Sequence, residues 1–147
     1  MIQINLVDKN KLMCDEWEKH FSNINNVNVH CGDFFDLNPD CIVSPANSFG
    51  FMDGGLDAVI TKNLGKQVQE KVQAIIKADY SGELLVGDSF LTETDSDIVP
   101  YILVAPTMRI PHKLKDSINV YLASRTIFLK IKEIENLTWL ILVLVVI

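Results

Sequence analysis

Residues 40–60 read DCIVSPANSFGFMDGGLDAVI, and this stretch decides the fold. Its apolar core, residues 41–43, predicts a short buried strand, and the segment that follows is a loop that contains Gly50, Gly54 and Gly55. From about Leu56 onward the apolar side chains take helical spacing. A strand that runs through a glycine-bearing loop into a helix is typical of α/β proteins.

The rest of the chain continues this alternation of strands and helices. Apolar runs predict further strands at residues 2–7, 27–31, 88–92, 101–105 and 137–147. Apolar stripes predict further helices: one with Met13, Trp17, Phe21 and Ile24, one over residues 66–79 with Val68, Val72, Ile75 and Ile76, and one over residues 113–135 with Ile118, Leu122 and Leu129. Without a repeat or a linker, the chain is expected to form one domain, residues 1–147, of the α/β class with a largely covered sheet.

Composition excludes some classes of function. The formal net charge of −6 argues against nucleic-acid binding, whereas an anionic small ligand can still be held by backbone amides. Cys14, Cys31 and Cys41 are widely spaced, which indicates reduced thiols in a cytoplasmic protein rather than a disulfide framework. No His or Cys spacing is typical of a zinc site, so we expect neither a metal nor a cofactor. The N-terminus shows no secretion signal.

The last predicted strand, residues 137–147, is strongly apolar. It is about half as long as the roughly 20 residues that a membrane helix needs, and it is rich in β-branched side chains. We therefore expect a buried strand and no membrane association. Because residues 140–147 carry no polar side chain, such a strand has to be covered on both faces, as in the centre of a helix-flanked sheet.

Three loop features are candidates for binding a ligand, and each also has a plain structural explanation. Gly54 and Gly55 allow close backbone approach and precede helix amides that could bind phosphate, but they also suit an ordinary connection. Asn47 follows the end of a strand and could bond ribose hydroxyls or satisfy its own loop. Asp33 follows Gly32 and could accept a hydrogen bond from an exocyclic amine or cap a turn.

The order of these motifs resembles the macro domain family. Gly32-Asp33-Phe34 is similar to the adenine turn of that family, residues 40–48 to its strand ending in Asn, and residues 54–60 to its glycine-rich loop opening into a helix. Residues 82–88 and 101–106 also resemble the family, so that the similarity spans roughly residues 27–135. The resemblance implies a three-layer α/β/α fold with a mixed sheet and implies ADP-ribose or a derivative as ligand.

The resemblance also implies roles for individual residues. It assigns ligand contacts to Asp33 and Phe34 at the adenine, Asn47 at the distal ribose, and Gly54, Gly55 and Leu56 at the diphosphate. An enzyme of this kind would hydrolyse at the distal ribose, as an ADP-ribosyl hydrolase or an ADP-ribose phosphate or ester hydrolase, with Asn47 orienting the ribose and Asp53 positioning water. Asp57 is interpreted as a first-turn anion of the helix. A reader of ADP-ribose and a hydrolase remain alternatives.

The chain departs from the family pattern in three places. Ser44-Pro45 stands where the family has Asn-Ala, and bulkier residues 49–53 replace a run of glycines. The apolar tail stands where the family has a second glycine-rich loop, so we expect a C-terminally truncated fold with a half-enclosed ligand. The tail also supports an alternative from another class, a non-catalytic interaction subunit that docks, or self-associates, through its apolar C-terminal strand.

Overall fold

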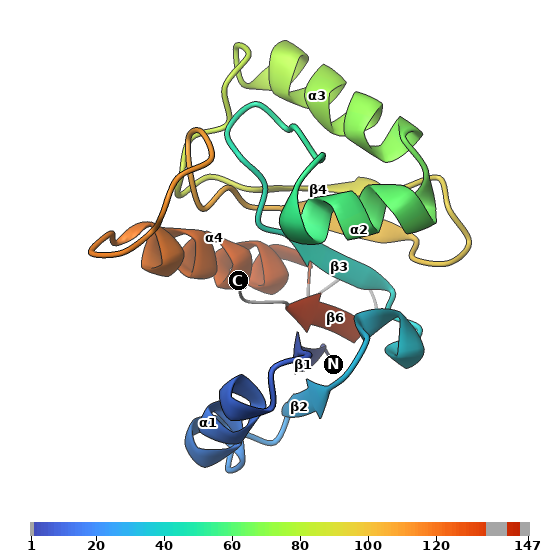
Figure 1. Ribbon diagram of the computed structural model, residues 1–147. Coiled ribbons are helices and arrows are strands. Elements are labelled where there is room, and N and C mark those ends of the chain that lie inside the picture. Colours follow the sequence, from blue (N-terminus) through green and yellow to red (C-terminus); the bar gives the residue numbers. More distant parts are fainter. Residues whose placement is uncertain (1, 135–140, 145–147) are drawn as a thin grey trace.

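The computed structural model describes residues 2–134 and 141–144, which form helices on both faces of one sheet (Figure 1). In chain order the elements are β1 (Gln3–Asp8), α1 (Lys11–Phe21), β2 (Val27–Cys31), the 3₁₀ helix η1 (Phe34–Leu37), β3 (Cys41–Ser44), α2 (Gly55–Leu64), α3 (Gln67–Asp79), β4 (Phe90–Glu93), β5 (Tyr101–Val104), α4 (Asn119–Ile134) and β6 (Ile141–Leu144). The expected α/β class is confirmed.

The sheet is mixed. Its strand order is β2-β1-β6-β3-β5-β4, with every neighbouring pair parallel except β4 and β5, which are antiparallel. Since β1, β2, β3 and β5 run in one direction, the loops that follow them leave the sheet at one edge. Ligands of open α/β sheets bind at that edge, outside the carboxyl ends of the strands.

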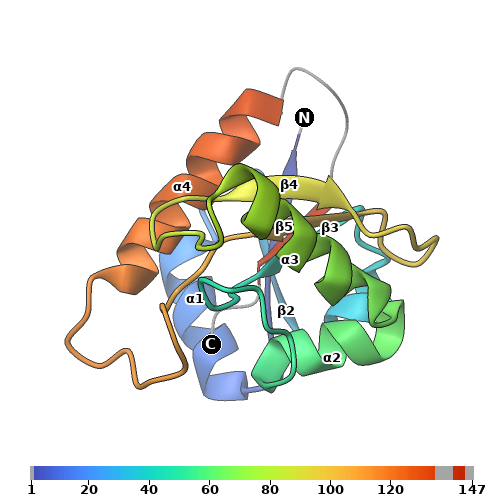
Figure 2. The same ribbon diagram turned by 90° about the horizontal axis from the view of Figure 1, so that it is seen from above.

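Two apolar clusters cover the two faces of the sheet. In β3, Ile42 contributes to the cluster under α2 and α3, while Cys41 and Val43 contribute to the cluster under α1 and α4. This alternation follows from the two-residue period of a strand. Figures 1 and 2 show the result as three layers, with α2 and α3 on one face and α1 and α4 on the other.

β6 lies in the interior of the sheet. Its residues pair with β1 from Gln3↔Ile141 to Leu6↔Leu144, and with β3 through Cys41↔Leu142 and Ile42↔Val143. The predicted tail strand is therefore confirmed for residues 141–144, whereas residues 137–140 and 145–147 lie outside the described part of the chain. Within residues 2–134 and 141–144, no helix has the length and apolar character that crossing a membrane requires.

The predicted helix over residues 113–135 was wrong at its start. α4 begins at Asn119, because Asp116 has a positive φ of 62° and the Ser117 hydroxyl accepts a hydrogen bond from the Asn119 amide at 3.1 Å. Its buried residues are Ala123, Thr126, Ile127 and Ile131, while Ile118 and Leu129 are exposed. Three of these recur every four residues, so the packed face is displaced from the predicted stripe.

The predicted stripe of the first helix was also partly wrong. Cys14 and Trp17 are its buried residues, Met13 is exposed, and the helix ends at Phe21, before Ile24. Asn10 caps it, accepting a hydrogen bond from the Leu12 amide at 3.0 Å. The inward residue of this turn is therefore Cys14, where Met13 was expected.

Candidate functional site

The loops after β3 and β5 meet at the carboxyl edge of the sheet. The Ser48 amide donates to the carbonyl of Met108 at 3.1 Å, and the Thr107 amide donates to the carbonyl of Pro45 at 3.0 Å. The guanidinium of Arg109 lies 5.2 Å from the centre of the Phe49 ring. These contacts bind the two loops into one surface beside the start of α2.

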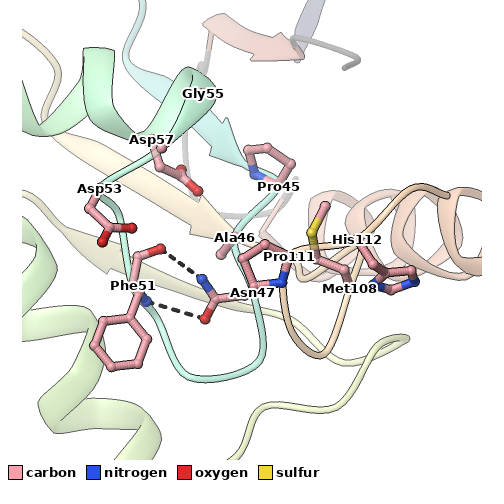
Figure 3. A pocket seen from close by; sticks show the side chains of 11 residues that line it. Pro45, Ala46, Asn47, Phe51, Asp53, Gly55, Asp57, Met108, Pro111 and His112 are labelled. Atoms are coloured by element: carbon pink, nitrogen blue, oxygen red, sulfur yellow. Dashed lines mark hydrogen bonds between the residues drawn. The ribbon is translucent and has the colours of Figure 1, made fainter.

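Asn47 is buried at the centre of this surface, and it holds its own loop (Figure 3). Its side-chain amide donates to the carbonyl of Phe51 at 2.9 Å, and its Oδ1 accepts from the amides of Phe49 and Phe51 at 3.0 and 3.3 Å. The carboxamide has two N–H donors and one oxygen. The oxygen accepts twice and one donor is used, so within the described residues one N–H of Asn47 has no hydrogen-bond partner.

The bulky residues of this loop are accommodated by packing one of them inside the protein. Met52 is 1% exposed, and its amide donates to Oε1 of Gln69 at 2.6 Å. Gly50, with a φ of 71°, lies so close to α3 that an added Cβ would be 2.9 Å from Val72. The loop is thus fixed to α3 at Gly50 and Met52, and this anchoring leaves Asp53 exposed at the edge of a cavity.

The first turn of α2 presents free backbone amides. Gly54 is its N-cap with an extended backbone, Gly55 has a φ of 55°, and among the described residues no side chain caps the helix. A Cβ added at either glycine would have no atom within 4 Å. Uncapped amides at the positive end of a helix dipole can bind an anion such as a phosphate.

Asp57 is a candidate site residue whose position was predicted only in part from the sequence. It lies in the first turn of α2, as expected, but its carboxylate is buried and accepts a hydrogen bond from the Ser44 hydroxyl at 2.6 Å. Burial raises the pKa of Asp57 to about 6, although the bond from Ser44 opposes the shift. Its spacing to the buried Ile60 and Leu64 is the signal that could have placed it on the inner face.

A cavity of about 300 Å³ lies between these loops and α2. It is lined by Pro45, Ala46, Asn47, Phe51, Asp53, Gly54, Gly55, Asp57, Met108, Pro111 and His112. In Figure 3, Asp53 and Asp57 lie on one side of it, and Met108 and His112 on the other. His112, whose Nδ1 lies 2.7 Å from the carbonyl oxygen of Ile110, was not among the predicted site residues, because nothing in its local sequence marks it. The cavity thus contains two carboxylates and an imidazole.

A second cavity, of about 270 Å³, lies at the other side of the α2 N-terminus. It is lined by Val7, Asp8, Lys9, Gly32, Phe34, Gly55, Leu56 and Val59. Phe34 is buried there, while Gly55 and Leu56 supply the helix end. Gly55 lines both cavities, so they adjoin at the start of α2, and the two together are called the cleft below.

Asp33 is not among the residues that line the second cavity. Its Oδ1 accepts from the Phe35 amide at 3.1 Å, which caps η1, and its Oδ2 is 2.8 Å from Nζ of Lys9. The hydrogen bond from Lys9, followed by that from Phe35, lowers the pKa of Asp33. Of the predicted contacts, the structure gathers Phe34, Asn47, Gly54, Gly55 and Leu56 along the cleft and leaves Asp33 beside it, paired with Lys9.

Comparison with known proteins shows which family model this chain matches and which solved structures have a similar fold. A family model described as Macro domain matches residues 43–136, which is more than half of the chain. An uncharacterized protein of Aquifex aeolicus (strain VF5) is 36% identical over 86 residues, an alignment that covers 58% of this chain and 48% of that protein. The aligned region therefore spans about half the length of this curated relative.

Several solved structures share the fold. The macrodomain of Mycobacterium tuberculosis DarG has 21% identity and a TM-score of 0.56, covering 71% of this chain and 66% of that chain. A variant of the Oceanobacillus iheyensis macrodomain with ADPR has 16% identity and a TM-score of 0.60, over 78% and 80% of the two chains. Thermosipho africanus DarTG in complex with ADP-ribose has 13% identity and a TM-score of 0.57, over 97% and 53%.

Proposed function

The chain belongs to the macro domain family, and on that premise we propose that it binds ADP-ribose or an ADP-ribose derivative in the cleft across the α2 N-terminus. The observation that carries the proposal is that Gly55 lines two cavities, one on each side of an uncapped helix end. ADP-ribose has the matching form, since a diphosphate separates two bulky groups, the adenosine and the distal ribose. Two of the solved relatives named above hold this ligand.

The adenosine fits the second cavity. Phe34 and Leu56 offer apolar surface to a purine ring, and Val59 extends that surface along α2. Asp33, beside the cavity, carries a carboxylate that can accept from the exocyclic amine of adenine once Lys9 swings away. Lys9 is 73% exposed, so its ammonium can leave Asp33 without a large desolvation cost.

The diphosphate fits between the cavities, at the first turn of α2. The amides of Gly54, Gly55 and Leu56 lie at the positive end of the helix dipole, and the space beside both glycines is open. Backbone amides hold phosphate oxygens without any basic side chain. This mode of binding is consistent with the net charge of −6, since it does not depend on a basic surface.

The distal ribose fits the first cavity. Asn47 keeps one N–H that can donate to a ribose hydroxyl, and Asp53 can accept from one. Hydrolysis at this ribose is a second candidate function, and it is favoured by the buried carboxyl of Asp57. With a pKa of about 6, that group can exchange a proton near neutral pH beside the atoms that would react.

Calorimetry with ADP-ribose, ADP and AMP tests the binding proposal. We expect one ligand per chain, with ADP-ribose bound more tightly than AMP, which lacks the distal ribose and one phosphate. Asp36→Ala, an acidic change on η1 outside both cavities, is the control for a general loss of charge. Absence of heat at millimolar ADP-ribose, with the chain folded by circular dichroism, would overturn the proposal.

Hydrolysis is tested separately by release of ADP-ribose from an ADP-ribosylated protein and of phosphate from ADP-ribose phosphate. Asp57→Asn and Asp53→Asn are the informative variants, because both side chains line the ribose cavity. Tight binding of ADP-ribose with no release in either assay would favour a reader over a hydrolase.

The alternative function, docking on a partner through the C-terminal strand, has less support than ligand binding. Residues 141–144 pair with β1 on one side and β3 on the other, so this part of the strand has a partner at both edges. Self-association through the C-terminal strand is tested by light scattering over a range of concentrations. A mass that stays at one chain would exclude it.

A further inference from the structure

Cys14 of α1 and Cys31 of β2 lie near each other at the interface between helix and sheet, since the Cys14 sulfur is close to the carbonyl group that precedes Cys31. Along β2, Val27 and Val29 pack on the cluster that contains Trp17 of α1, and Cys31 is the next residue on that face. Cys14 lies on the inner face of α1, three residues before Trp17. Both thiols therefore belong to one interface, although 17 positions separate them in the sequence.

The sulfur of Cys14 lies beside the backbone that leads into Cys31. Its Sγ is 3.3 Å from the carbonyl oxygen of Asp8 and 3.9 Å from that of His30. Asp8 is the register partner of Cys31 in the parallel pair of β1 and β2, and the carbonyl of His30 belongs to the peptide group that joins it to Cys31. Burial, and then hydrogen bonding to the Cys31 thiol, raises the pKa of Cys14.

The two thiols differ in exposure, and this difference gives them different chemical roles. Cys31 is an exposed residue that a dissolved oxidant can approach, whereas Cys14 is 4% exposed and is shielded from solvent. An accessible cysteine beside a second, buried one is an arrangement suited to reversible oxidation.

We propose that Cys14 and Cys31 form a reversible oxidation site, which a hydroperoxide converts into an intramolecular disulfide. The thiolate of Cys31 attacks the hydroperoxide, the O–O bond breaks, and hydroxide or an alkoxide leaves with the electron pair. The resulting Cys31 sulfenic acid is attacked by the sulfur of Cys14, which forms the S–S bond and releases water. Both sulfur atoms are oxidised and the peroxide is reduced; a dithiol reverses the step by exchange.

The disulfide would join α1 to the strand that leads directly into Gly32 and Asp33. Loop closure between residues 14 and 31 restricts the unfolded chain, so the oxidised form should melt at a higher temperature. The inference does not depend on the proposed ligand, and its test needs none.

Peptide mapping of the full chain gives the test. Trypsin separates residues 12–19, which contain Cys14, from residues 20–62, which contain both Cys31 and Cys41. We therefore use Cys41→Ala, in which Cys31 is the single cysteine of the larger peptide. After hydrogen peroxide, we expect the two peptides to be linked, the intact mass to fall by two hydrogen atoms, and dithiothreitol to restore the parent mass and melting temperature.

Cys14→Ser in the same background is the matched control. It leaves Cys31 exposed without a resolving thiol, and a 1,3-dione should trap the Cys31 sulfenic acid in this variant but not in the parent. Equal trapping in both chains, oxidation of Cys31 to the sulfinic acid in the parent, or links between different chains in place of the internal one would each overturn the proposal.

Discussion

The hydroxyl of Ser44 donates a 2.6 Å hydrogen bond to Oδ1 of Asp57, and both side chains are buried. The bond joins the last residue of β3 to the first turn of α2, so it fixes the strand to the helix whose amides face the cleft. It also stabilises the charged form of Asp57 against the effect of burial. Position and protonation of this carboxyl group therefore depend on Ser44.

Ser44→Ala should destabilise the protein by about 1–3 kcal/mol, because it removes a bond to a buried charged group. The pKa of Asp57 should rise above about 6, and the loss of stability should be larger at pH 8 than at pH 5. Urea unfolding at both pH values measures this. Ser89→Ala is the control, since Ser89 is a buried serine whose hydroxyl pairs with Thr126, which does not titrate. An equal cost at both pH values for Ser44→Ala would contradict the assigned bond.

Asp57→Asn should stabilise the protein above pH 6. A carboxyl group whose pKa is raised from 3.8 to about 6 holds its proton more tightly in the folded state, so stability falls as pH rises through this range. The gain in the variant should be on the order of 3 kcal/mol at pH 8, at about 1.4 kcal/mol per pKa unit, and should vanish below pH 4. Thermal melts from pH 4 to 8 measure the difference. Asp53→Asn, at an exposed carboxylate of the same cavity, is the control.

Local pattern was enough to predict most elements, and tertiary contact explains the failures. The strand over residues 27–31 coincides with β2, and the helix predicted from about Leu56 onward is α2, which begins at Gly55. The start of α4 was misplaced because residues 113–118 carry no strong breaker, and what interrupts the helix is a left-handed Asp116. The rotation of α4 about its own axis decides which of its residues pack on the sheet. The apolar spacing of the sequence is compatible with more than one packed face.

The candidate site was predictable where it consists of backbone and not where it depends on contacts between distant residues. Glycines before a helix indicated the amides at Gly54 and Gly55, and the structure gathers them with Asn47. The pairing of Lys9 with Asp33 follows from β1 and β2 being parallel neighbours, a pairing that no local motif specifies. The family resemblance is confirmed over residues 43–136, whereas the assigned ligand contacts stay predictions.

Asp33→Ala should weaken ADP-ribose binding by about ten- to a hundredfold, as expected for the loss of a hydrogen bond to a charged group. Lys9→Met separates this effect from the loss of the ion pair, because it removes the partner charge and leaves the carboxylate free. We expect Lys9→Met to bind ADP-ribose at least as tightly as the parent, because no ion pair has to break, and to change stability by less than about 1 kcal/mol, as for an exposed pair. Calorimetry on both variants measures the affinities. Equal affinity of Asp33→Ala and the parent would remove Asp33 from the site.

Gly54→Ala and Gly55→Ala form a matched pair at the diphosphate position. Both add a methyl group in open space, but only Gly55 has a positive φ, of 55°. Gly55→Ala should therefore cost about 1–2 kcal/mol of stability, and Gly54→Ala should fold like the parent. Both should weaken ADP-ribose binding, because the methyl group stands in front of the amides. If Gly54→Ala bound ADP-ribose like the parent, the diphosphate would not lie against that residue.

Asn47→Asp tests the distal ribose position while keeping the two loop bonds that the Asn47 oxygen accepts. An aspartate keeps the oxygen that accepts from the amides of Phe49 and Phe51, and it loses the N–H groups that reach the Phe51 carbonyl and a ligand hydroxyl. Asn47→Ala would lose every one of these bonds and should destabilise the chain by about 1–3 kcal/mol, which would obscure any effect on binding. For Asn47→Asp we expect ADP-ribose affinity to fall by at least about tenfold, the effect of losing roughly 1.4 kcal/mol. AMP affinity should stay unchanged, because AMP carries no distal ribose. A parallel loss for both ligands in calorimetry would mean that Asn47 acts through the shape of the whole cleft, and the assigned ribose contact would have to be abandoned.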